Sequence, residues 1–362
     1  MLSVNYATFR ARKVLLKVVV SFIVLCVSAV TPAAHASKSE VSLSSKVSEN
    51  ARREFNSFLR HTPINTPNVN FIIDPLLNPV YASQIRSDVF TNVGMWSELR
   101  NIEGPMNVYA APTQNFSFVY EYLKQDLAPQ GLEFGWLDKK AERAREEPTG
   151  FFGGAAPGDT KTGNAVLMVY VPNGTSPTDA HWKSLTSHEY VHVAQRSVLK
   201  GTMAPMQCWV REGLANFIGW SYSGRGNLTT YVRSWKAQLQ DLENERQYSV
   251  SQRLSRKYWE NWFVASERQD IRTDCDPTQN YVIGALAFQY LYGTYGYEKV
   301  STYLRNLVSA IEPCGDGSPT YFTTCMPARN DAFMQAFGIS LRDIYPKFAA
   351  HIVTELRWFT TK

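Results

Sequence analysis

One stretch of the sequence, residues 186–217, decides the predicted fold, and it reads TSHEYVHVAQRSVLKGTMAPMQCWVREGLANF. It contains His188, Glu189 and His192 in the order His-Glu-x-x-His, and Glu212 follows after nineteen intervening residues. Helix residues four apart lie on the same face, so two imidazoles at this spacing can reach one metal ion. A catalytic zinc takes two such imidazoles with a carboxylate and keeps one position for water. We therefore expect one zinc ion on the two histidines and Glu212, with Glu189 as the base beside its water.

The sequence before the motif favours a helix. Ser176-Pro177-Thr178-Asp179 is typical of a helix start with Ser176 as the N-cap, and the helix would run to about residue 198. His181 lies seven residues before His188, and we leave it out because a fourth protein ligand would close the site to water. The alternative to a catalytic centre is a degenerate metalloprotein, in which the ligands serve the structure or have lost their ion.

The first 36 residues have the three parts of a secretory signal peptide. Four basic residues come first, a 13-residue apolar run follows at 18–30, and Ala34-His35-Ala36 supplies small residues for cleavage. An uncleaved membrane anchor is the alternative, but a membrane span needs about 20 apolar residues. We therefore expect cleavage after Ala36, a secreted or periplasmic protein, and no stable membrane anchor in the mature chain.

Loss of residues 1–36 would remove four basic residues and no acidic one, so the formal net charge falls from +5 to +1. The remaining charges are scattered, as on an ordinary solvated surface, and predict no nucleic-acid partner. The same cut leaves four cysteines, Cys208, Cys275, Cys314 and Cys325. An even count in an exported chain indicates two disulfides, with three possible connectivities.

The segments before the motif predict a mixed α/β lobe. Strand-like segments at 68–73, 106–110 and 165–171 alternate with helical patterns at 51–60, 80–100 and 116–127. Residues 148–164 hold five glycines and two prolines. They predict a loop, either a plain connection or the mobile rim of a cleft.

The segments after the motif predict a mostly helical lobe, with patterns at 209–220, 229–245, 258–267, 281–295, 297–311 and 331–356. Trp235, Trp259 and Trp262 either line a pocket or pack in the core, as most buried aromatic residues do. The expected division is a signal peptide at 1–36, a flexible leader at 37–50, an α/β lobe at 51–198 that ends in the motif helix, and a helical lobe at 199–362.

The run from Trp209 to Phe217 resembles the third-ligand segment of the gluzincin metallopeptidases, above all their aminopeptidase N-like and peptidase MA-like groups. Those enzymes have a similar Trp-x-x-Glu-Gly-x-Ala-x-aromatic run on the helix after the zinc helix. The resemblance implies an α+β, thermolysin-like zincin catalytic domain. In such a domain His188, His192 and Glu212 would bind zinc, and Glu189 would act as the base. It also implies that the strand directly before the zinc helix, here 165–171, forms the edge to which an extended substrate pairs.

A second match begins at Tyr281, whose Tyr-Val-Ile-Gly run is similar to a helix of the aminopeptidase N-like branch. There the tyrosine hydrogen-bonds the tetrahedral intermediate, so Tyr281 is expected to share the oxyanion with zinc. Thermolysin-like enzymes use a later histidine, but His351 is the only one after Glu212 and has no matching motif around it. Asn216, one turn beyond Glu212, either orients a metal ligand or faces solvent.

The cysteine positions suggest one of the three pairings. Cys208 lies four residues before the third ligand, and Cys275 lies six before the tyrosine. We expect these two to pair, which would fix the ligand relative to the oxyanion donor. Cys314 and Cys325 would then close the small loop between them.

The resemblance leaves strict aminopeptidase activity in doubt. No Gly-x-Met-Glu-Asn run, which carries the glutamate that grips a free amino terminus, precedes the zinc helix, and only about 150 residues lie before it. We expect an exported zinc-dependent peptidase that acts on peptide or protein substrates, more as an endopeptidase than as an exopeptidase. The alternatives are a catalytically inert peptide- or surface-binding protein on the same scaffold, and a zinc hydrolase of non-peptide substrates.

Overall fold

The structure is a computed structural model of the chain and describes residues 43–61, 68–99, 105–127, 135–148, 150, 152–156, 165–244, 249–268, 275, 277–315 and 321–360. All of them belong to one compact unit, Val41–Lys362. The expected signal peptide at 1–36 and residues 37–42 of the expected leader lie outside the described residues. The described chain is mostly helical with one small mixed sheet, which confirms the α+β class.

The sheet has the strand order β1 (Val69–Ile73), β2 (Met106–Pro112), β4 (Ala165–Val171) and β3 (Phe152–Ala156). The first three strands are parallel, and β3 pairs antiparallel to β4 with Gly153 opposite Val169. β4 is thus an inner strand, and the expectation that residues 165–171 form the edge of the sheet is wrong. The reason is that residues 152–156, which the glycines predicted as loop, add a strand outside β4.

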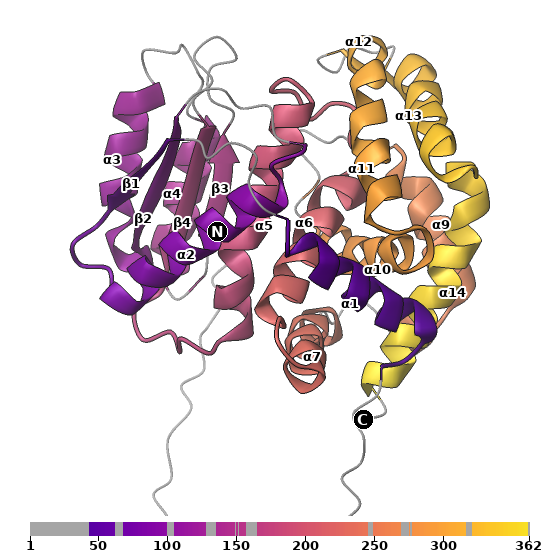
Figure 1. Cartoon of the computed structure of the whole chain (residues 1–362), viewed down its shortest axis with the longest axis horizontal. Coiled ribbons are helices and arrows are strands. Elements are labelled where there is room, and N and C mark those ends of the chain that lie inside the picture. Colours follow the sequence, from indigo (N-terminus) through magenta and orange to yellow (C-terminus); the bar gives the residue numbers. More distant parts are fainter. Residues whose placement is uncertain are drawn as a thin grey trace, which may run out of the picture. The chain divides into compact units, whose positions relative to one another are not determined.

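Helices pack on both faces of the sheet (Figure 1). They are α2 (Pro79–Met95), η1 (Thr113–Asn115), α3 (Phe116–Leu127), α4 (Gly135–Glu146) and α5 (Ala180–Val198), of which α4 was not expected. Leu167 and Val169 of β4 belong to the same core as α2 and α5, whereas Val166 and Met168 belong to the core formed with α3 and α4. A strand buried on both faces is a continuous apolar run, which is why β4 does not alternate.

The rest of the chain is helical: α1 (Lys46–Phe58), α6 (Cys208–Ser223), α7 (Leu228–Asn244), α8 (Val250–Arg253), α9 (Arg256–Ser266), α10 (Thr278–Tyr295), α11 (Tyr297–Asn306), η3 (Leu307–Ala310), α12 (Ile311–Cys314), α13 (Tyr321–Phe337) and α14 (Leu341–Thr360). Residues 46–50, expected in a flexible leader, are the first turn of α1, which packs through Val47 against Gly293 of α10. The single pattern expected at 331–356 is divided between α13 and α14, because Gly338 at φ +70° ends the first helix.

Two close helix crossings fix the position of α6. A Cβ at Gly213 of α6 would overlap the backbone of Gly284 of α10, so only glycine allows this approach. On another side of α6, a Cβ at Gly219 would lie 2.8 Å from the backbone oxygen of Ser184 in α5. α6 is thus held tightly between the motif helix and α10.

One hydrophobic core extends from the inner face of the sheet to α6, α10 and α14. Trp235 and Trp259 are fully buried in it, and Trp262 packs against it. Core packing therefore explains the first two tryptophans. α5 and α6 both contribute to this core, so it continues across the boundary expected between residues 198 and 199.

The four cysteines form two disulfides, Cys208–Cys275 and Cys314–Cys325, which are the pairs expected from the sequence. Both lie in one small buried cluster together with Ala204. Disulfides are typical of proteins in oxidising compartments. Among the helices that the structure describes, none combines the length and the apolar character needed to cross a membrane.

Candidate metal centre

The motif lies on α5, as expected, although the helix begins at a different cap. Asp179 is the N-cap, and its side chain accepts a hydrogen bond of 3.0 Å from the Trp182 amide, whereas Ser176 bonds within the turn before it. The expectation of Ser176 as the cap is therefore wrong by three residues. The two motif histidines lie on one face of α5, with 3.2 Å between the Nε2 atoms of His188 and His192.

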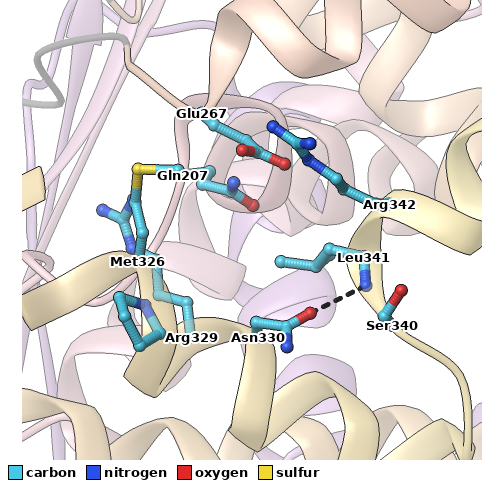
Figure 2. Close-up of a pocket in the computed structure, with 9 residues that line it drawn as sticks. Gln207, Glu267, Met326, Arg329, Asn330, Ser340, Leu341 and Arg342 are labelled. Atoms are coloured by element: carbon cyan, nitrogen blue, oxygen red, sulfur yellow. Dashed lines mark hydrogen bonds between the residues drawn. The ribbon is translucent and has the colours of Figure 1, made fainter. Parts of the chain in front are cut away.

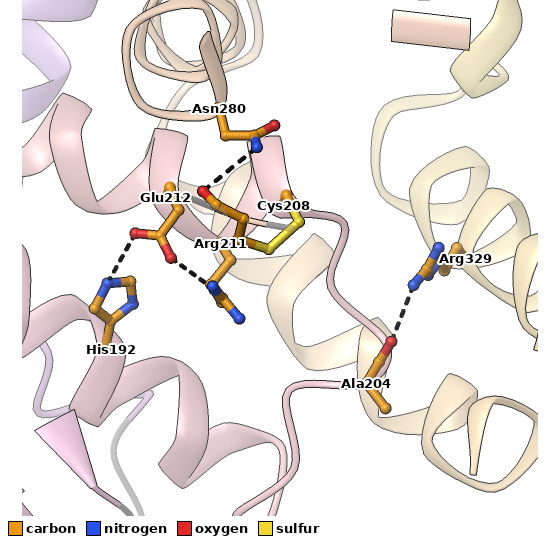
Figure 3. Close-up of a disulfide and its surroundings, with 8 residues drawn as sticks. His192, Ala204, Cys208, Arg211, Glu212, Asn280 and Arg329 are labelled. Atoms are coloured by element: carbon orange, nitrogen blue, oxygen red, sulfur yellow. Dashed lines mark hydrogen bonds and ion pairs between the residues drawn. A yellow bond between two sulfur atoms is a disulfide. The ribbon is translucent and has the colours of Figure 1, made fainter. Parts of the chain in front are cut away.

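Glu212 of α6 completes a group of three potential metal ligands. Its Oε2 lies 3.2 Å from His192 Nε2 (Figure 3). The same oxygen lies 3.6 Å from His188 Nε2. Ligands of a tetrahedral ion with bonds of about 2.0–2.1 Å lie roughly 3.3 Å apart. The three atoms are already near that spacing, so His188, His192 and Glu212 could hold one metal ion.

Asn216 orients His188. Its Oδ1 lies 2.7 Å from His188 Nδ1, and because this oxygen can only accept, Nδ1 carries the proton. The lone pair of His188 is then on Nε2, which faces the other two ligands. Asn216 thus occupies the orienting position that was one of its two predicted alternatives.

Gln195 orients His192 in the same way, and this role was not predicted from the sequence. The Oε1 atom of Gln195 lies 2.9 Å from His192 Nδ1, while its Nε2 donates to the backbone oxygen of Arg211 at 3.0 Å. This amide is almost fully buried and connects α5 with α6. A glutamine one turn after the second histidine is the only signal that the sequence offered.

Arg211 holds the carboxylate of Glu212, and this contact was also not predicted from the sequence. Its Nε donates to Glu212 Oε1 at 2.7 Å, which leaves Oε2 directed at the histidines (Figure 3). Burial alone would raise the pKa of Glu212, but the neighbouring His192, His188 and Arg211 hold this pKa well below its ordinary value. Glu212 is therefore a carboxylate at neutral pH.

Burial and neighbouring charges also act in opposite directions on the pKa of His188. Burial lowers this pKa, but the Glu212 and Glu189 carboxylates more than compensate, and the net shift is upward. Arg196, one turn after His192, adds positive charge, and burial together with Arg211 lowers the pKa of its guanidinium to about 10. The centre thus brings two carboxylates and two arginines together in a region largely shielded from water.

The side chain of Glu189 extends from α5 toward β3, the outer strand of the described sheet. It is only 7% exposed, and a Cβ at Gly153 of β3 would overlap its carboxyl group. Any side chain at position 153 would force the Glu189 carboxyl group to move, so glycine lets β3 approach the carboxylate as closely as it does. The segment predicted as a loop therefore contributes backbone next to the predicted base.

Tyr281 reaches the centre from α10. Its ring stacks on that of His188, with 5.9 Å between ring centroids and 12° between ring planes. The crossing of Gly213 with Gly284 brings the two helices together, since Gly213 follows Glu212 and Gly284 comes one turn after Tyr281. His181, which was left out as a ligand, does not belong to the group of three.

Comparison with known proteins gives no match for this chain among family models, curated proteins or solved structures. The resemblance to gluzincins therefore rests on the sequence motifs.

Proposed function

We propose that this protein is a zinc-dependent peptidase of the gluzincin type. The observation that carries the proposal is the convergence of His188 Nε2, His192 Nε2 and Glu212 Oε2 at 3.2 to 3.6 Å, with the charge of Glu189 close enough to raise the pKa of His188. Two imidazoles and one carboxylate are the ligand set of a catalytic zinc that keeps a position open for water. A bound zinc ion would polarise a carbonyl group and make its water a nucleophile near neutral pH.

Each remaining residue has a role that follows from its position. Glu189 would take a proton from the attacking water and deliver it to the leaving amine. The hydroxyl of Tyr281 would donate to the oxygen of the scissile carbonyl as negative charge develops there. Asn216 and Gln195 would keep both imidazoles in the orientation and tautomer that ligation needs.

The edge strand β3 would align the substrate. A free strand edge can pair with an extended peptide through main-chain hydrogen bonds, which requires no particular side chains. Because Gly153 of β3 lies against Glu189, a peptide paired there would run past the base. Main-chain pairing with the substrate was expected for residues 165–171 and is now proposed for residues 152–156. A thermolysin-like arrangement, with an antiparallel edge strand beside the zinc helix, is part of the proposal.

A peptide library tests the proposal, with half of the peptides blocked at the amino terminus. We expect cleavage of blocked and unblocked peptides by the zinc-loaded protein and none after chelation. Cleavage of unblocked peptides only would replace the endopeptidase assignment with an exopeptidase. Zinc binding at one ion per chain without cleavage would instead support the inert binding protein on the same scaffold.

A further inference from the structure

A cavity of about 400 Å³ lies where the N-cap of α6 and the end of α9 meet α13 and α14. Its lining residues are Gln207, Glu267, Met326, Pro327, Arg329, Asn330, Ser340, Leu341 and Arg342 (Figure 2). None of them belongs to the metal centre. A volume of this size is within the range of small-molecule sites, which are mostly apolar with a few fixed polar groups.

One wall of the cavity presents hydrogen-bond acceptors. Gln207 is 3% exposed, and its Oε1 has no hydrogen-bond partner among the described residues. The Glu267 carboxyl group, which is 6% exposed, points into the same part of the cavity in Figure 2. Both lie next to the Tyr345 hydroxyl, whose pKa burial and Glu267 raise well above its ordinary value. The Tyr345 hydroxyl can donate to Glu267, but Gln207 Oε1 is a buried acceptor without a donor in the described part of the chain, which is costly. This wall is therefore suited to a ligand that donates.

Two arginines, Arg342 and Arg329, also line the cavity and carry positive charge. Arg342, in the first turn of α14, is exposed, and its guanidinium is directed toward Glu267 in Figure 2. Arg329 is almost fully buried and donates to the backbone oxygens of Pro205 and Ala204 at 2.9 and 3.0 Å. These bonds commit Arg329 to the segment before α6, whereas Arg342 can bind a ligand.

We propose that this cavity binds a free α-amino acid with an apolar side chain. Glu267 and Gln207 Oε1 would accept from its ammonium group, and Arg342 would bind its carboxylate. Met326, Pro327 and Leu341 would contact its side chain. A simple anion would meet the Glu267 carboxylate and a simple cation would meet Arg342, so the two charges together favour a zwitterion.

This binding site is independent of the proposed peptidase activity, and its test needs no catalysis. Calorimetric titration of the full chain with L-leucine should show saturable binding of one molecule per chain. The titration is run with zinc and again after chelation, because an amino acid can also bind an exposed metal ion. Binding that disappears with the metal would place leucine at the metal centre and overturn the proposal.

Blocked ligands test both charged contacts. N-acetyl-leucine lacks the ammonium group and leucinamide lacks the carboxylate, so each should bind at least about tenfold more weakly than leucine, as expected for the loss of a charged hydrogen bond. Equal binding of N-acetyl-leucine would show that the cavity takes a plain anion. Equal binding of leucinamide would show that Arg342 has no role.

A matched pair of variants locates the site on the protein. Arg342→Gln should weaken leucine binding at least about tenfold. Lys347→Gln removes an exposed charge from the same helix, away from the cavity lining, and should leave binding unchanged. Both changes are at exposed positions, so both variants should fold. No saturable binding by the unmodified protein, or equal effects of the two variants, would contradict the proposal.

Discussion

His188 and His351 are both buried histidines with a glutamate nearby, and they differ in what their ring nitrogens contact. In the metal centre the Nδ1 atoms of His188 and His192 bond to amide oxygens, and both Nε2 atoms converge on Glu212. His351 lies on α14, where its Nε2 bonds to Gln289 Oε1 at 2.9 Å. Its Nδ1 lies 3.8 Å from Glu355.

In the group around His351, protein donors satisfy the carboxylate. Glu355 accepts a hydrogen bond of 2.6 Å from Ser48 and another from Ser44, both near the start of α1. This cluster therefore fastens the N-terminal segment to α14. Burial lowers the pKa of His351 to about 3, whereas the carboxylates around His188 overcome the same effect. Burial and residue type are thus alike in the two groups, and only around His188 do ligand atoms converge so that they could hold a metal ion.

Loss of a ligand should give the largest difference between the two groups. His192→Ala removes one of three ligand atoms and should weaken zinc binding by more than about 100-fold, beyond what supporting residues contribute. His351→Gln should leave zinc binding unchanged. Zinc stoichiometry and competition with a chelator measure both. Full zinc binding by folded His192→Ala would contradict the assignment of His192 as a zinc ligand.

The tyrosines near the two histidines give the next contrast. The ring of Tyr281 lies 5.9 Å from that of His188, and the ring of Tyr290, on the same helix, lies 5.6 Å from that of His351. Tyr281→Phe should lower kcat by about 100-fold with zinc content unchanged, because it removes a donor to the developing oxyanion. Tyr290→Phe should have the kcat of the unmodified protein. Equal kcat values for the two variants would remove Tyr281 from the mechanism.

The amides that hold the histidines should have different effects in the two groups. Asn216→Ala should weaken zinc binding by about 10- to 100-fold, because the ring of His188 loses its orientation. Gln289→Ala should leave zinc affinity unchanged and lower the free energy of unfolding by about 1–3 kcal/mol, since it leaves His351 without its partner. Chelator competition and denaturant unfolding separate the two results. A zinc effect from Gln289→Ala would contradict the assignment.

The pH dependence of stability should show the smallest effect. His351 has a pKa of about 3 in the folded protein and an ordinary value of about 6.5 when unfolded. The unfolded chain therefore binds the proton first as the pH falls, and the stability present above pH ~6.5 is lost toward pH ~3. The raised pKa of Glu355 opposes this at lower pH, so the window to measure is about pH 6.5 to 5.

Comparison with His351→Gln isolates this contribution. His351 should contribute a fall of at most about 1.4 kcal/mol per pH unit to the free energy of unfolding in this window. The variant should have a smaller slope by nearly this amount. Parallel pH profiles would show that His351 takes up a proton in the folded state as readily as in the unfolded one.

The sequence predicted the parts of the centre that are local. The four-residue spacing of His188 and His192 is a property of one helix, and the run around Glu212 predicted the third member of the group that could hold a metal ion. Most helices were also predicted, because their apolar residues repeat with the helical period. Tyr281 could be named only from the resemblance, and its position beside His188 needed the structure.

The parts that were missed depend on contacts between distant segments. Gln195 and Arg211 look like ordinary polar helix residues until α6 packs on α5. The strand β3 is rich in glycine, which predicts a loop, yet Gly153 allows the strand to lie directly against the Glu189 side chain. Similarly, the approach of α6 to α10 depends on Gly213 and Gly284, which both lie in the quoted runs, but neither run shows that the two glycines meet.

Glu189→Gln tests the central claim most directly, because it removes the base and keeps the three ligands and the size of the side chain. Zinc content and peptide hydrolysis are measured on the same purified sample. The proposed mechanism predicts one zinc ion per chain, as in the unmodified protein, and no hydrolysis. Undiminished hydrolysis by the zinc-loaded variant would contradict the mechanism, and loss of zinc would show that Glu189 belongs to the ligands.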